Sequence, residues 1–580
     1  MKKIILTAVP LLLTQCMFCQ FYIRGQVAST RGQRLPSVKL TSKVSKLVYK
    51  TDPYGNFGFS ATASKDTLSF SCDGYDTVTV TVNAEEYVRV ILKPLPSSVI
   101  FTNDNSSVII QHADPGNERS IKEETYSYTN EFGFQKTITT PGVAFSANIN
   151  RASYSNVRRL INEMDGLLPP NAVRIEEMLN YFNFNYNVPA KDSVFSCSSY
   201  LTSCPWNKKS ELLFVNISAK KINVSNTPPA NLVFLLDVSG SMDMPNKLPL
   251  IQSGFIKMVK NLRPTDTVSL ITFGETIQVL LEGMPGTQKD EIVKALEKIT
   301  ADGNTPGEAG IRLAFKIAKK RFIKNGNNRI ILAADGDFNI GMSTEKDLMN
   351  LIQQEKQSGI YLSCLGVGSG NYKDSKLYAL AQKSNGNFAY IDNEQEAERV
   401  LVTDITKTLF TVAEDVYITV IFNPDKVNEY RLVGYENDHT VTAESKQKLK
   451  GGEIGSGHSL MAVFELTPVD TGRRENNWLA KMKVHYKLPL QTQDYTIAYT
   501  CPDKLVALKQ TDSSIRKAAS VVMFGMKLKD SDYSKTISWR SLQKLAYGCF
   551  NKDRYIDKEF LTLIAKAKKM YTHRRKYGGE

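Results

Sequence analysis

One short stretch of the sequence carries the residue types of a metal site. Asp237, Ser239 and Ser241 occupy alternate positions directly after the apolar run Leu232–Leu236. On a turn between a strand and a helix, this spacing places one carboxylate and two hydroxyl groups around a single point. Mg²⁺ prefers hard oxygen ligands, takes about six of them and usually keeps several as water. The stretch therefore predicts a magnesium site.

Two other parts of the chain supply matching oxygen donors. Thr305 lies in the turn-rich loop Gly303–Gly307, and Asp335 directly follows the apolar run Arg329–Ala334. In open α/β sheets, ligands bind beyond the carboxyl ends of the strands. We therefore expect both residues on the same side of the sheet as Asp237. The predicted metal ligands are Asp237, Ser239, Ser241, Thr305 and Asp335.

Strands and helices alternate around these loops. Strands are predicted over Leu232–Leu236, Thr267–Phe273, Ile277–Leu281, Arg329–Ala334, Ile360–Val367 and Phe388–Ile391. Helices are predicted over Leu248–Leu262, Lys289–Ile299, Ala309–Phe322, Glu345–Gln357, Leu377–Lys383 and Glu396–Leu409. This alternation indicates an α/β domain, Rossmann-like in architecture, whose mostly parallel sheet carries helices on both faces.

The five oxygen donors resemble the metal-ion-dependent adhesion site of von Willebrand factor A-type domains. The resemblance implies that Ser239, Ser241 and Thr305 bind the ion through their hydroxyl groups, whereas Asp237 and Asp335 act largely through water. Two carboxylates leave a divalent cation electrophilic, so an acidic group of a protein partner can replace a water. We expect Mg²⁺ as the cofactor, with Ca²⁺ or Mn²⁺ as alternatives.

Other chemistries fit the sequence less well. The segment Asp335–Asn339 begins like an EF-hand loop, but Gly341 falls one place late and Lys346 occupies the place of the bidentate glutamate. Asp337 is assigned to the support of the loop rather than to the metal. His458 beside a serine is interpreted as a turn histidine rather than a catalytic base. We expect no catalytic residue and no enzyme activity.

The first residues predict export. Lys2 and Lys3 precede the apolar stretch Ile4–Leu13, which is typical of a secretory signal over residues 1–20. Cys16 and Cys19 are candidates for lipid attachment, and lipidation is the only membrane link that we expect. The expected location is the periplasm, outer membrane or cell surface of a bacterium.

Charge and cysteine content exclude other classes. The net charge of +14 is spread along the chain, and basic residues do not interleave with aromatic ones, so we expect no nucleic-acid partner. Six cysteines lie beyond the predicted signal without the paired spacing of a zinc site. Cys197 and Cys204 would close a small loop as a disulfide, and buried free thiols are the alternative.

The chain before the α/β segment divides into three parts. Residues 21–95 have short β-branched runs separated by turn formers, which predicts a β-sandwich. Gly25–Val27, Thr51–Phe57 and Asp73–Thr77 resemble the carboxypeptidase-regulatory, transthyretin-like module, which implies an accessory domain. Residues 96–136 are polar and are predicted to be a linker. Residues 137–225 carry two short helical patterns, Ser153–Ile161 and Val173–Tyr181.

The α/β segment, residues 226–412, is followed by a β-rich region over 413–510 and a helical region over 511–580. Strands are predicted before it over Leu212–Ile217 and after it over Val416–Phe422, Leu460–Leu466, Met482–Tyr486 and Tyr495–Tyr499. Helices are predicted over Ser513–Lys529 and Ser541–Lys569. We hypothesise that both flanks build one sandwich into which the α/β domain is inserted.

These flanks resemble the N-terminal flanking region and the C-terminal region of a bacterial family of von Willebrand A proteins. The resemblance rests on Ala152–Arg159 and Val173–Phe182 before the α/β segment, and on Tyr430–Asn437 and Gly455–His458 after it. Family members carry an Asp-x-Asp before the first of these segments. Here those positions are Asn148 and Asn150, so a charge-based role of that pair is not expected.

The favoured function is an exported cell-envelope binding or adhesion protein that recognises an acidic group through Mg²⁺. A metal-dependent hydrolase of envelope peptides or polymers is one alternative, although no motif places a general base near the site. A structural envelope scaffold, in which the metal only locks the loops, is the other.

Overall fold

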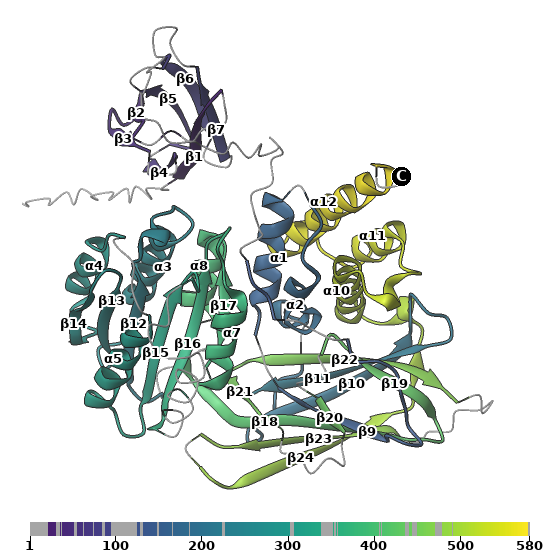
Figure 1. Cartoon of the computed structure of the whole chain (residues 1–580). Coiled ribbons are helices and arrows are strands. Elements are labelled where there is room, and N and C mark those ends of the chain that lie inside the picture. Colours follow the sequence, from purple (N-terminus) through teal and green to yellow (C-terminus); the bar gives the residue numbers. More distant parts are fainter. Residues whose placement is uncertain are drawn as a thin grey trace, which may run out of the picture. The chain divides into compact units, whose positions relative to one another are not determined.

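The structure is a computed structural model (Figure 1). It describes residues 21–93 and 124–577 apart from internal gaps, the longest of which is 338–351. The chain forms two compact units that divide at Gly116 and Asn117. The predicted signal, with Cys16 and Cys19, lies outside the described residues. Within the described residues, no helix is both long enough and apolar enough to cross a membrane.

The N-terminal unit contains two small β-sheets. The first has the order β4 (Asn56–Ala61), β1 (Phe21–Ser29), β7 (Tyr87–Leu92). The second has the order β3 (Val48–Lys50), β2 (Lys39–Ser42), β5 (Lys65–Ser71), β6 (Val78–Asn83). Both sheets contribute side chains to one core, where the rings of Phe57 and Phe70 lie 5.2 Å apart. This agrees with the expected sandwich of short strands.

A six-stranded sheet forms the centre of the second unit. Its order is β14 (Ile277–Pro285), β13 (Thr267–Phe273), β12 (Ala230–Asp237), β15 (Asn327–Ala334), β16 (Ile360–Val367), β17 (Phe388–Ile391). All neighbours are parallel except β14, which pairs antiparallel with β13 at the edge. The described helices of this domain are α3 (Leu248–Lys260), α4 (Lys289–Glu297), α5 (Gly307–Lys320), α7 (Asp374–Lys383) and α8 (Glu394–Glu398).

The continuous apolar run of β12 is explained by burial on both faces of the sheet. Every residue of β12 is buried. Phe234 belongs to the core on one face, whereas Val233 and Leu235 belong to the core on the other. A strand buried on both sides needs no alternation of apolar and polar residues. The predicted α/β architecture is therefore confirmed.

Strands from both sides of the α/β domain form two further sheets. One has the order β25 (Leu505–Val506), β10 (Phe195–Ser203), β11 (Glu211–Ala219), β22 (Ser459–Pro468), β19 (Val427–Val433), β8 (Gln135–Lys136). The other has the order β20 (Thr440–Thr442), β9 (Gly142–Ser146), β18 (Thr411–Phe422), β23 (Trp478–Lys487), β24 (Asp494–Pro502), and β21 (Gly452–Gly455) pairs with β18.

These sheets confirm the insertion hypothesis. Strand β11, which precedes the α/β domain, pairs antiparallel with β22, which follows it. In the same way β9 pairs with β18. Phe145, Leu213 and Phe464 from the two sheets share one core. The α/β domain therefore leaves and rejoins a single sandwich (Figure 1).

Five helices pack into another core beside the sandwich. They are α1 (Ala152–Glu163), α2 (Ile175–Tyr181), α10 (Ser513–Lys529), α11 (Trp539–Tyr547) and α12 (Tyr555–Tyr577). Figure 1 shows α1 between the α/β domain and the C-terminal helices. The helical pattern predicted over Ser541–Lys569 is divided between α11 and α12. A turn separates them, where Asp557 accepts a hydrogen bond from the backbone N–H of Asn551 at 2.8 Å.

Two further predictions need correction. The predicted helix Glu396–Leu409 begins as α8 and continues as a π-helical turn over Arg399–Thr403. The predicted linker 96–136 extends too far, because its last part is packed: Glu124 forms an ion pair with Arg159 at 2.8 Å, and β8 joins the sandwich. An ion pair and a two-residue strand produce no periodic apolar pattern in the sequence, so this packing could not be predicted from it. Most of the predicted helix Glu345–Gln357 lies outside the described residues.

The cysteines of the described chain are free thiols. Cys197 and Cys204 do not form the disulfide that their spacing suggested. Cys204 is buried, and burial, followed by the charge of Glu465, raises the pKa of its thiol to about 12. The predicted alternative of buried free thiols holds for Cys204, whereas Cys197 is a free thiol that is half-buried.

Candidate metal centre

Adjacent parallel strands bring the two predicted acidic residues together. Asp237 ends β12, and Asp335 follows the last residue of β15. The register pairs Leu236 with Ala333, so the two chains leave the sheet at the same edge. Both aspartates have no exposed surface. The sheet topology thus fixes two carboxylates at one point, as expected.

The two serines lie between these carboxylates. The backbone N–H of Ser239 donates to Asp237 Oδ1 at 2.9 Å, which fixes the start of the loop. The hydroxyl groups of Ser239 and Ser241 are 3.2 Å apart. Ser241 Oγ donates to Asp335 Oδ2 at 2.8 Å. Four of the five predicted ligands therefore form one cluster of oxygen atoms.

The fifth predicted ligand, Thr305, lies outside the described residues. Helix α5 begins at Gly307, directly after the gap over 302–306. The clustering of Thr305 with the other four residues therefore stays a prediction.

One carboxylate oxygen of the cluster has no hydrogen-bond partner within the described part of the chain. It is the buried Asp237 Oδ2. A buried polar atom without a partner carries a free-energy penalty, which a bound cation would remove. Burial and then the negative charge of Asp335 raise the pKa of Asp237 to about 7. This oxygen is therefore a donor that a bound divalent cation would engage.

A buried lysine, which the sequence analysis did not identify, joins the cluster. Lys247 Nζ donates to Asp335 Oδ2 at 2.8 Å and to Asn371 Oδ1 at 2.7 Å. Its side chain is only 2% exposed. Burial raises the pKa of Asp335, but the charge and hydrogen bond of Lys247, together with the hydrogen bonds from Asp337 N–H and Ser241, outweigh burial and the pKa is lowered. Asp335 is therefore held as a carboxylate.

Asn371 connects the cluster to the neighbouring loop. Its side-chain N–H group donates to Asp335 Oδ2 at 2.9 Å and to Asp337 Oδ2 at 3.1 Å. Asp337 thus supports the loop, in line with its predicted role. Asn371 follows β16, the next parallel strand, so its place at the same edge was a signal in the predicted topology. Lys247 gave no such signal, because an isolated lysine before a helix is usually exposed.

The donor set fits magnesium by its chemistry. Two carboxylates and two hydroxyl groups are hard oxygen donors. The two carboxylates and the ammonium group of Lys247 together keep a net negative charge, which favours a bound cation. No group of three His, Cys, Asp or Glu side chains that could hold a metal occurs among the described residues, so an all-carboxylate or zinc-type cluster is not formed there. A site of this composition would rely on hydroxyl groups and water to complete the shell.

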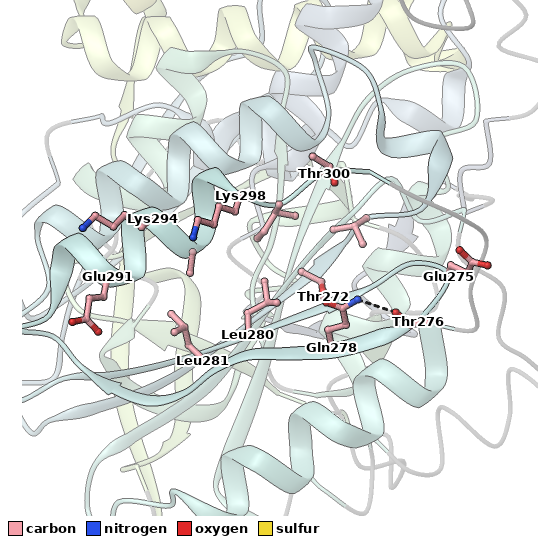
Figure 2. Close-up of a pocket in the computed structure, with 13 residues that line it drawn as sticks. Thr272, Glu275, Thr276, Gln278, Leu280, Leu281, Glu291, Lys294, Lys298 and Thr300 are labelled. Atoms are coloured by element: carbon pink, nitrogen blue, oxygen red, sulfur yellow. Dashed lines mark hydrogen bonds between the residues drawn. The ribbon is translucent and has the colours of Figure 1, made fainter.

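A cavity of about 590 Å³ lies in the α/β domain between β14 and α4 (Figure 2). Val238, which lies between two of the predicted ligands, contributes to its wall, together with Thr272 and Thr300. Lys294 of α4 and Leu280 of β14 also line it. The wall combines apolar side chains with charged ones of both signs, because Glu275 and Glu291 line it together with Lys294 and Lys298.

His458 has a structural environment. Its ring is buried, and Nδ1 accepts a hydrogen bond from the backbone N–H of Gly455 at 3.3 Å. Burial, and then the positive charges of Arg151 and Lys407, lower the pKa of His458. These contacts agree with the predicted turn histidine.

In comparisons with known proteins, the chain matches three family models. The model described as von Willebrand factor type A domain matches residues 232–337, and the one described as von Willebrand factor matches residues 120–214. The model described as Uncharacterized protein YfbK, C-terminal, matches residues 407–570. Together they cover the first part of the α/β domain and much of both of its flanks.

Individual relatives agree with these matches. Uncharacterized protein YfbK of Escherichia coli (strain K12) is 35% identical over 478 residues, which cover 78% of this chain and 81% of that protein. Uncharacterized protein sll0103 of Synechocystis is 26% identical over 185 residues, which cover 32% of this chain and 43% of that protein. Among solved structures, a von Willebrand factor type A protein from Catenulispora acidiphila has 14% identity and a TM-score of 0.39, with 63% of this chain and 88% of that chain covered.

Proposed function

Because the chain belongs to the YfbK-related family of bacterial von Willebrand factor A-domain proteins, we propose that it is a binding protein of the cell envelope. It recognises an acidic group on a protein partner through a divalent cation, Mg²⁺ in the first place. It acts by binding and not by catalysis.

One observation carries this proposal: Asp237 Oδ2, within a cluster of oxygen donors, has no hydrogen-bond partner among the residues that the structure describes. Asp237, Ser239, Ser241 and Asp335, with Thr305 as the expected fifth member, would hold the ion. The hydroxyl groups and water that would complete the shell are neutral, so the ion stays electrophilic. It therefore keeps affinity for one more anionic oxygen. That oxygen comes from the partner.

The envelope location rests on the sequence of the first residues. Lys2 and Lys3 before the apolar stretch Ile4–Leu13 favour export, and Cys16 or Cys19 offers a site for a lipid anchor. The N-terminal sandwich, with its turn motifs Thr51–Phe57 and Asp73–Thr77, acts as a carboxypeptidase-regulatory-like accessory module. Both are parts of the same proposal.

Calorimetric titration of the full chain with Mg²⁺ tests the metal site. Asp237→Ala is expected to weaken Mg²⁺ binding by at least about tenfold, because it removes a carboxylate from the shell. Asp290→Ala, at an exposed position of α4, is the matched control and should bind Mg²⁺ like the unaltered protein. Equal Mg²⁺ affinity in Asp237→Ala and the unaltered chain would rule out the site.

The partner is tested in a second step. Immobilised protein is incubated with envelope extract with and without Mg²⁺. A protein retained only with Mg²⁺, and only by chains with an intact Asp237, supports recognition through the ion. Retention that ignores both Mg²⁺ and Asp237→Ala contradicts it and favours a metal-independent scaffold.

A further inference from the structure

A second cavity lies away from the metal centre, where the sandwich, the α/β domain and the flanking helices meet. Its volume is about 890 Å³, and none of the predicted metal ligands lines it. Sites for small molecules fall in the range of roughly 300–1,000 Å³. Its polar wall includes residues from four parts of the chain: Arg151, Lys221, Arg399, Lys407, Asp404 and Arg554.

The wall of this cavity has an excess of positive charge. Six cationic side chains and two carboxylates are among the described residues that line it. Asp404 is shared by three of the cations: Lys407 at 2.6 Å, Arg151 at 2.7 Å and Arg399 at 3.6 Å. One carboxylate cannot neutralise three cations, so this part of the wall stays positive.

A further carboxylate, Glu396, is shared between Arg399 and Arg158. Glu396 lies 3.8 Å from Arg399 Nε, but it binds Arg158 at 2.9 Å and accepts a hydrogen bond from Tyr181 at 2.7 Å. Arg399 also packs against an aromatic face, with its guanidinium carbon 3.6 Å from the ring centre of Tyr181. Arg158 is also bound by Asp392 and Glu559, so Glu396 offsets part of the charge of Arg399. The surplus around Asp404 is therefore carried mainly by Arg151 and Lys407.

The remaining cations of the wall extend the positive surface. Lys517 is paired with the second carboxylate, Asp557, at 2.5 Å. Arg554 and Lys221 have no carboxylate within salt-bridge distance among the described residues. Both therefore add positive charge that no carboxylate of the described residues pairs with.

Two further observations indicate that the described residues do not fully balance these cations. Arg151 Nε is buried and has no hydrogen-bond partner in the described structure. Burial, and then the charge of Arg151, lower the pKa of Lys407, as expected where like charges are crowded. A buried guanidinium N–H without an acceptor is costly, and an anion in the cavity would supply that acceptor.

We propose that this cavity binds a small anion that carries a phosphate or carboxylate group. Guanidinium groups match the paired oxygens of both anions, which favours Arg151 and Arg554 as contacts. Phe182 and Tyr555 also line the cavity and offer apolar surface to the rest of the ligand. The site is independent of the metal centre and of the acidic partner proposed for it.

Calorimetric titration of the metal-free full chain tests the proposal, with chelator removed beforehand and without phosphate or sulfate in the buffer. The probes are inorganic phosphate, pyrophosphate and citrate, so that phosphate and carboxylate ligands are compared directly. At least one probe is expected to bind saturably. Arg554→Ala should weaken that binding by about tenfold, the effect of losing one charged hydrogen bond.

Two variants separate this site from general effects of charge. Arg540→Ala removes an exposed arginine of α11, outside the cavity, and should leave anion binding unchanged. Asp237→Ala should also keep anion binding, because it alters only the metal centre. Lys407→Met removes one of the three cations around Asp404 and should also weaken anion binding. Circular dichroism checks that this variant is folded.

Two results would overturn the proposal. The first is that none of the three probes binds the folded chain at millimolar concentrations. The second is that Arg554→Ala and Lys221→Ala bind the probes as tightly as Arg540→Ala does. Either result would make the positive wall a purely structural feature.

Discussion

At the scale of single residues, the metal centre combines two carboxylates with a buried ammonium group. Lys247 contacts Asp335 at 2.8 Å, on the oxygen that also accepts from Ser241. The lysine balances one carboxylate when no divalent cation is bound, and a bound cation would have to tolerate its positive charge. Lys247 is therefore expected to limit metal affinity while it protects the fold of the metal-free site.

Lys247→Met tests this double role. Breaking a buried ion pair from one side costs about 3–5 kcal/mol, so the metal-free variant should unfold at a lower temperature. Removal of the nearby positive charge should at the same time increase the stabilisation that Mg²⁺ provides. Thermal unfolding with and without Mg²⁺ measures both effects.

The control for Lys247→Met lies on the helix that follows it, α3. Lys257 forms only exposed ion pairs, and its side chain is 36% exposed. Lys257→Met should change the stability by less than about 1 kcal/mol and leave the Mg²⁺ response unaltered. If the two variants behaved alike, Lys247 would have no special role at the site.

At the scale of elements, the loop after β16 holds the lysine in place. Gly368 has φ +86°, and a Cβ at this position would lie 2.3 Å from Cε of Lys247. Gly370 has a similar φ of +92°, but a Cβ there would have no atom within 4 Å. Glycine is thus favoured at position 368 by the positive φ and by the lack of space for a Cβ beside Lys247. At position 370 only the positive φ favours it.

This pair of glycines gives a matched prediction. Gly370→Ala should cost about 1 kcal/mol through backbone strain. Gly368→Ala should cost a further 1–3 kcal/mol, roughly the penalty of overpacking, because Lys247 must move. Urea unfolding of both variants measures the difference, and a smaller loss in Gly368→Ala than in Gly370→Ala would contradict the packing argument.

At the scale of the whole molecule, the inserted α/β domain is joined to the sandwich by buried charges. Arg329 of β15 has no exposed surface and binds Glu453 of β21 at 2.9 Å. Glu453 also accepts a hydrogen bond from Thr411 at the start of β18. One ion pair therefore links the central sheet of the insert to the strands that follow it.

Arg329→Met should weaken this link. The expected loss of unfolding free energy is about 3–5 kcal/mol, since Glu453 would stay buried without its partner. Arg312→Met is the control: its pair with Glu308 lies at the surface, where the arginine side chain is 48% exposed, and should be worth less than about 1 kcal/mol. Urea unfolding followed by tryptophan fluorescence and by circular dichroism measures both variants.

The two optical probes add a second criterion. Coincident transitions in the unaltered chain and separate ones in Arg329→Met would mean that the pair couples the insert to the sandwich. A loss no larger than that of Arg312→Met would show that the pair is dispensable.

The sequence by itself determined the α/β domain and the clustering of four of the residues predicted as metal ligands. Apolar strands such as Leu232–Leu236 must be buried on both faces, and parallel strands end at one edge, so Asp237 and Asp335 had to lie near each other. The composition of these local segments was sufficient, because periodicity and the positions of strand ends are local properties of the chain.

Only the tertiary structure decided which distant polar groups meet. The packing of Glu124 against Arg159, the burial of Lys247 and the crowding of cations around Asp404 join residues that are far apart in the chain or carry no local signal. A charged side chain is expected at the surface, because burial of a charge is stable only when a specific partner is present. The fold decides which residue becomes this partner, and the sequence around the charged residue does not reveal it.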